Sequence, residues 1–213
     1  MIPLLHRIIS NRWYLFILFI LLSPLVWNLL TQPQQLIDTW QTVPTKIQQR
    51  GTSIVTGDFH QKFIELRWGG QKFHREGIYY KIIYNPGLNY LNEAFNYLHY
   101  LKLRLYFHAG DGTNFSPAHI DPIPFVIIPA FIIGLVVIIK QQQWIPLGLL
   151  LSFTFIAYWV GIRNFALLFP TALVIYYISA IGISKLQFKY ALTYIIIVII
   201  YSLYILTSWQ IAS

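Results

Sequence analysis

The stretch RLYFHAGDGTNFSPAHIDPIPF, residues 104–125, brings together the side chains of this chain that are best suited to chemistry. Its histidines and aspartates are His108, Asp111, His119 and Asp121. Imidazole and carboxylate both ligate divalent cations, so a cation site is one hypothesis. The spacing, however, matches no ligand pattern of known geometry, such as His-Glu-x-x-His on a helix. The alternative is structural: a turn at the glycines around Asp111, with His119 and Asp121 capping the following helix.

Ser116 adds the third residue type that a serine hydrolase needs. It lies too close in sequence to His119 and Asp121 for a typical catalytic triad, and no nucleophile elbow is visible. Nucleophilic hydrolysis is therefore a poor explanation of this stretch.

The composition is that of an integral membrane protein, with 56% hydrophobic and only 10% charged residues among 213. The net charge of +8 is the difference between 15 basic and seven acidic residues, and all seven acidic residues lie between Asp38 and Asp121. Outside that region the basic residues stand at the ends of apolar runs, which is typical of topology signals. We therefore expect no nucleic-acid partner.

Five apolar segments without charged residues approach the roughly twenty residues that a transmembrane helix needs. They are residues 13–31, 123–139, 144–160, 164–183 and 190–208. Because every backbone amide inside a bilayer needs an internal partner, isolated spans of this kind must be helical. The predicted fold class is an all-α multi-spanning membrane protein with about five transmembrane helices.

The basic residues predict the orientation of these spans. Arg7 and Arg12 precede the first span, Lys140 lies between the second and third, and Lys185 with Lys189 lies between the last two. Placing all of them inside makes the N-terminus cytoplasmic. The predicted organisation is a cytoplasmic N-terminus with the first helix (1–31), an extracytoplasmic loop domain (32–122) and a four-helix membrane region (123–213). The expected location is a plasma membrane.

The predicted extracytoplasmic loop is mixed in character. Residues 52–70 have β-branched and aromatic residues with a glycine pair, which favours a short hairpin. Residues 89–107 have apolar and aromatic residues three and four apart, which favours an amphipathic helix at the membrane interface.

Arg163 is the only basic residue in the short turn between the third and fourth predicted spans, against the topology bias. A guanidinium at the membrane interface either reaches the headgroups by snorkelling or binds an anion, and a lipid phosphate is the anion available there. Arg104 is a second candidate of the same kind.

Three stretches resemble the multi-spanning membrane glycosyltransferases of the mannosyltransferase-like superfamily, which have the GT-C fold. YNPGLNYLNEAFNYLHYLKLRLYFHAGDGTN is similar to a loop helix followed by an aromatic run and Gly-Asp in bacterial members. AHIDPIPFVIIPAFIIGLVVII resembles the histidine-containing approach to the next span, and RNFALLFPTALVIYYISAIGI resembles an arginine-led helix with an internal proline. The similarity covers the C-terminal half of such an enzyme.

The resemblance implies hexosyl transfer from a polyprenyl-phosphate sugar donor at the outer face of a bacterial plasma membrane. It implies that Arg163 contacts the donor phosphate and that Asp111 and His119 line the outer cavity. The family's catalytic acid lies in an N-terminal region onto which no position here maps. The resemblance therefore implies part of an enzyme: either the chain is a truncated or split reading frame, or a partner chain supplies the acidic half. No cofactor is implied, although a divalent cation at the histidines and aspartates stays open.

A non-catalytic alternative is an integral membrane subunit that scaffolds a complex through its loop. The lack of a complete acid, base or metal set motivates it. A transporter is disfavoured because no charged residue lies in the middle of a span, where coupling ions usually need one.

Overall fold

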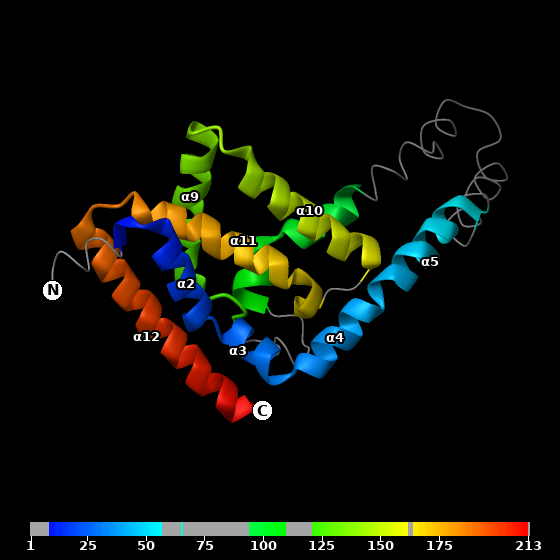
Figure 1. The fold of residues 1–213 in the computed structure, drawn as a ribbon, viewed down its shortest axis with the longest axis horizontal. Coiled ribbons are helices and arrows are strands. Elements are labelled where there is room, and N and C mark those ends of the chain that lie inside the picture. The colour runs from blue at the N-terminus through cyan, green and yellow to red at the C-terminus, as the bar shows by residue number, and fades with distance from the viewer. Residues whose placement is uncertain (1–8, 57–64, 66–93, 110–120, 162–163, 213) are drawn as a thin grey trace.

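The computed structural model of the chain is a bundle of helices (Figure 1) and describes residues 9–56, 65, 94–109, 121–161 and 164–212. The α-helices are α2 (Arg12–Leu22), α3 (Pro24–Thr31), α4 (Pro33–Gln41), α5 (Val43–Thr56), α9 (Ile128–Lys140), α10 (Trp144–Val160), α11 (Phe165–Ser184) and α12 (Phe188–Ala212). Shorter helical turns are η1 (His99–Leu101), the π-helix η2 (Leu105–Ala109) and η3 (Phe125–Ile127). None of the described residues forms a β-strand. The all-α prediction is confirmed for this part of the chain.

All five apolar segments are helical, but their helices differ in length. Only α11 and α12 are long and apolar enough to cross a membrane, and the bent pair α2 and α3 makes a third candidate. The segment Phe125–Lys140 and helix α10 are shorter apolar helices, about 24–26 Å long at 1.5 Å per residue. A hydrocarbon core of about 30 Å exceeds that length. The structure thus supports two or three spans, and the count of five remains a prediction.

Helix α11 forms the centre of the bundle. In its most apolar 18-residue window 78% of the residues are buried, against 28% in that of α12. Helices α2, α9 and α10 all pack against α11, which is apolar on every side. An all-round apolar helix surrounded by others is expected to be the core element. Helix α12 keeps most of its apolar surface on the outside of the bundle.

Two glycines allow α9 and α11 to cross at close range. A Cβ atom on Gly134 of α9 would overlap the carbonyl oxygen of Ile178, and one on Gly182 of α11 would overlap that of Ala130. Ala130 and Gly134 are four residues apart and share one helix face, as in the small-xxx-small contacts of membrane helices. Backbone-to-backbone contact between α9 and α11 therefore requires both glycines.

The first apolar segment is broken in its middle, where α2 and α3 meet at an angle of 59°. Ser23 lies between the two helices and accepts a hydrogen bond from the Val26 amide, while Pro24 occupies the first turn of α3. Serine at the N-cap followed by proline is a strong helix-start signal. The buried Tyr176 hydroxyl of α11 donates to Ser23 Oγ at 2.8 Å, so the break is anchored to the core helix.

Helices α4 and α5 run one after the other along the outside of the bundle (Figure 1). Trp40 Nε1 donates to the Ala166 carbonyl at the start of α11, and Arg50 Nη1 donates to the Tyr158 carbonyl near the end of α10. The hairpin predicted for residues 52–70 does not begin as a strand, because residues 52–56 are the end of α5. The rest of that prediction lies outside the described residues, apart from the helical Glu65.

The amphipathic helix predicted for residues 89–107 is only partly regular. The described part is helical at 94–98, passes through η1, turns at Lys102 with φ −64° and ψ 122°, and ends in η2. Tyr100, Tyr106 and Phe107 are buried. Their rings contact Tyr158, Phe165 and Phe131 of three different helices. These three of the aromatic residues expected at a lipid interface thus fill the bundle, because irregular backbone lets each ring reach its own partner, whereas Phe95 is exposed.

Candidate functional site

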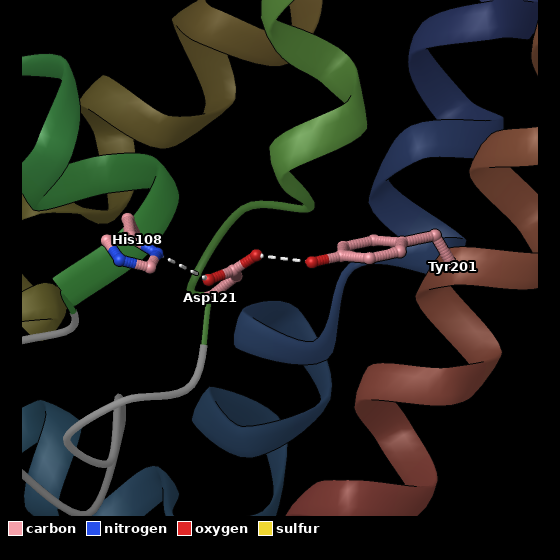
Figure 2. Close-up of polar contacts among 3 residues, drawn as sticks. All are labelled: His108, Asp121 and Tyr201. Carbon is pink, nitrogen blue, oxygen red and sulfur yellow. Dashed lines mark hydrogen bonds and ion pairs between the residues drawn. The ribbon is translucent and has the colours of Figure 1, made fainter.

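The polar cluster with the most chemistry consists of His108, Asp121 and Tyr201 (Figure 2). His108 comes from η2, Asp121 lies in the segment that leads into η3, and Tyr201 projects from α12. The Ile123 amide donates to the Tyr106 carbonyl at 3.0 Å, which holds the segment after Asp121 beside η2. The cluster therefore joins two neighbouring turns to a distant helix.

Asp121 is the centre of this cluster. The Tyr201 hydroxyl donates to its Oδ2 at 2.8 Å, and its Oδ1 lies 3.8 Å from His108 Nδ1. The carboxylate side chain is 11% exposed, whereas the imidazole is 71% exposed. At 3.8 Å the imidazole and the carboxylate are beyond hydrogen-bond distance. One carboxylate oxygen is thus fixed by a phenol, while the other faces a solvent-exposed imidazole.

An open pocket of about 450 Å³ surrounds this cluster, which we call the Asp121 pocket. Its walls are His108, Asp121, Phe125, Tyr201, Tyr204, Ile205 and Ser208. The volume lies within the range of small-molecule sites, which combine apolar walls with a few polar groups. The Asp121 pocket has this character, with aromatic and aliphatic walls around one carboxylate.

The arrangement is suited to accepting a proton or a hydrogen bond from a hydroxyl group. A general base must lie within hydrogen-bond reach of the group it deprotonates, and Asp121 Oδ1 faces the pocket's exposed histidine. A protonated His108 would pair with this carboxylate and compete with a ligand for it. The site thus has a base and a neighbour able to hold a proton.

Tyr106, close to this cluster, has a different role. Burial raises its pKa well above the ordinary value, and its hydroxyl donates to the Tyr100 carbonyl at 2.8 Å. A buried, neutral phenol that is hydrogen-bonded to backbone stabilises the turn. It takes no part in proton transfer near neutral pH.

The residues predicted from the sequence are only partly placed. Arg104 is exposed in the turn before η2 and is not among the residues that line the Asp121 pocket. Asp111, His119 and Arg163 lie outside the described residues. Within the described ranges no three His, Cys, Asp or Glu side chains gather closely enough to hold a metal ion. The cation hypothesis for residues 104–125 has therefore gained no support from this part of the chain.

Tyr201 is the member of the cluster that the sequence reasoning missed. The sequence feature that could have pointed to Tyr201 is its spacing from Tyr194, which lies seven residues earlier and hence on the same face of α12. The Tyr194 hydroxyl donates to the Val126 carbonyl and accepts from the Ala130 amide. Two tyrosines on one face of an otherwise apolar helix thus attach α12 to the segment that starts at Asp121.

Comparison of the chain with protein-family models, with curated proteins and with solved structures finds no match. Any functional conclusion therefore depends on the chemistry of the site and on the elements around it.

Proposed function

We propose that this chain is part of a membrane glycosyltransferase that uses a polyprenyl-phosphate sugar as donor, with the Asp121 pocket as its acceptor site. The observation that carries the proposal is the carboxylate of Asp121 in an open pocket, held by Tyr201 and facing His108. The apolar helix α12 forms one wall of this pocket. Only 28% of its most apolar window is buried, as suits a protein that handles a lipid-linked donor.

The proposed step transfers a hexose to an acceptor hydroxyl. The acceptor oxygen forms a new bond to C1 of the sugar, while the bond from C1 to the phosphate oxygen breaks. The electron pair of that bond leaves with the polyprenyl phosphate, and Asp121 takes the acceptor proton. Arg163 and Arg104 are the proposed phosphate contacts, with Asp111 and His119 lining the donor side. A partner chain supplies whatever further catalytic carboxylate the reaction needs.

The test uses membranes that contain the full chain together with its expected partner, a polyprenyl-phosphate hexose and a hydroxyl acceptor. We expect Asp121→Asn to lower transfer by about 100-fold or more, the usual contribution of a general base. Asp38→Asn is the matched control, because Asp38 is an exposed carboxylate on α4 that accepts a hydrogen bond from nearby Gln34 and does not line the Asp121 pocket. Transfer that survives Asp121→Asn undiminished, or that falls equally with Asp38→Asn, contradicts the assignment.

A second candidate function is that of a non-catalytic subunit which scaffolds a complex. The observation that favours it is the exposed apolar surface of α4 and α5, where Ile37 and Ile47 are exposed. A scaffold should co-purify with one partner in stoichiometric amount, and polar replacements of these two residues should release that partner. Asp121→Asn should then leave the complex and its activity intact.

A further inference from the structure

A second open pocket, of about 520 Å³, lies where α2 begins and where α9 and α11 end. Its polar lining includes Arg12, Lys185, Asn11, Gln141, Gln143 and Ser184. We call it the Arg12 pocket. The positive-inside rule would put this end of the bundle on the cytoplasmic side, opposite the Asp121 pocket.

Both charged side chains that line the Arg12 pocket are positive. Arg12 and Lys185 come from helices far apart in sequence, and every acidic residue of the chain lies between Asp38 and Asp121. No aspartate or glutamate is among the described residues that line the pocket, and none of the ion pairs in the described ranges involves either cation. Two cations facing one cavity without a carboxylate repel each other, and an anion between them relieves that repulsion.

Neighbouring rings hold Arg12 in place. Its guanidinium carbon lies 5.8 Å from the ring centroid of Trp13 and 5.8 Å from that of Tyr177. Contacts of this kind fix a planar guanidinium while leaving its N–H groups available to an acceptor. Arg12 is therefore better ordered than a solvated surface arginine.

The carboxamides supply neutral hydrogen-bond donors beside the cations. Gln143 Nε2 donates to Gln141 Oε1 at 3.1 Å, which turns the Gln141 oxygen toward its neighbour. Asn11 Oδ1 accepts from the Trp13 amide at 2.9 Å, so the carboxamide NH₂ is the group that this residue can offer to a ligand. The pocket thus combines two cations with amide donors, which is the chemistry that binds a phosphate group.

We propose that the Arg12 pocket binds a phosphate ester, with Arg12 and Lys185 as its two charged contacts. The ester is either the headgroup of an anionic lipid or a small soluble molecule, and both offer the same phosphate oxygens. The site is separate from the Asp121 pocket and does not depend on the transferase proposal. A phosphate occupies only a fraction of about 520 Å³, so the pocket also accommodates the group that the phosphate carries.

The test measures binding of short-chain phosphatidic acid to the purified full chain in neutral detergent, with phosphatidylcholine as the comparison lipid. We expect saturable binding of one phosphatidic acid per chain, weakened about tenfold by Arg12→Gln or by Lys185→Gln, as loss of one charge-assisted contact implies. Lys140→Gln and Lys189→Gln are matched controls, because each removes one positive charge near the same end without lining the pocket. These controls should bind within about twofold of the unmodified chain.

Glycerol 3-phosphate as competitor separates the two sources of the phosphate. Displacement of the lipid by this soluble ester assigns the pocket to small phosphate esters, and its failure to compete assigns the pocket to lipid headgroups.

Equal weakening by all four lysine and arginine variants, or absence of saturable binding, overturns the proposal. Should Arg12→Gln fail to fold, Arg12→Lys keeps the charge without the planar fork and should still weaken binding relative to Lys140→Gln.

Discussion

At the scale of single residues, Arg50 shows how one side chain can connect an outlying helix to the bundle. Its guanidinium donates to the Tyr158 carbonyl at 2.9 Å and lies 4.7 Å from the centroid of the Tyr158 ring. It also lies 5.8 Å from the centroid of Trp159, beside the end of α10 where Gly161 turns with φ 75°. A cation at a helix C-terminus interacts favourably with the helix dipole. Arg50 therefore combines a hydrogen bond, ring contacts and a dipole interaction.

We expect Arg50→Ala to destabilise the folded chain by about 1–3 kcal/mol, since a charge-assisted hydrogen bond and a cation–π contact are lost together. Arg50→Lys should retain part of the stability, because a point charge remains at the end of α10. Thermal unfolding in detergent measures the change. Lys46→Ala on the same helix is the charge-matched control, and an equal loss from it would show that Arg50 acts through charge alone.

The cluster around Asp121 illustrates what sequence can and cannot predict at this scale. His108 and Asp121 were singled out because the right residue types lie close together in the chain. Tyr201 was missed because its contact with Asp121 bridges 80 residues. Only the docking of α12 brings the phenol to the carboxylate, and an apolar helix carries little information about which neighbour it will meet.

At the scale of elements, the helical state of the five apolar segments was predicted, whereas α4, α5 and the interruptions of the helices were not. Long apolar segments leave the backbone one way to satisfy its hydrogen bonds, which explains why all five are helical. The break between α2 and α3 had a local signal in Ser23-Pro24, yet apolar residues on both sides concealed it. The irregular course of residues 94–109 had no such signal, because it arises from ring packing against three helices.

The crossing of α9 and α11 gives a prediction that belongs to this scale. Gly134→Ala and Gly182→Ala should each destabilise the bundle by about 1–3 kcal/mol or more, because the new methyl group meets backbone that cannot move aside. Reversible unfolding in mixed micelles checks this. Gly148→Ala is the matched control on α10, where a Cβ meets nothing within 4 Å. The control should be neutral or slightly stabilising, since alanine favours helix.

At the scale of the whole molecule, the two pockets lie at opposite ends of α12 and its partners. Ser184 lines the Arg12 pocket just before α12 begins, and Ser208 lines the Asp121 pocket near its end. The 21 residues of Phe188–Ser208 rise about 30 Å as a helix, which matches a hydrocarbon core. The distribution of basic residues in the sequence predicts which end of the bundle is cytoplasmic, and that orientation stays a prediction, whereas the pockets themselves depend on tertiary packing.

This arrangement predicts accessibility from opposite sides of the membrane. The chain has no cysteine, so Ser184→Cys and Ser208→Cys each introduce one reactive thiol by exchanging oxygen for sulfur. In intact cells a membrane-impermeant maleimide should label Ser208→Cys, and Ser184→Cys should react only after permeabilisation. Labelling of both variants from the same side would refute the orientation and, with it, the outer position of the Asp121 pocket.

The turn at Ser23 also determines the direction in which the chain continues. A straight helix through residues 12–31 would carry the chain away from the bundle along its own axis, whereas the 59° change of direction sends α3 obliquely toward α4. The Trp27 indole satisfies the Leu21 carbonyl at 2.8 Å, and Tyr176 satisfies Ser23, so the bend leaves these polar groups paired. Losing that bend would redirect the outlying pair α4 and α5 and separate Arg50 from α10, although neither helix had changed in sequence.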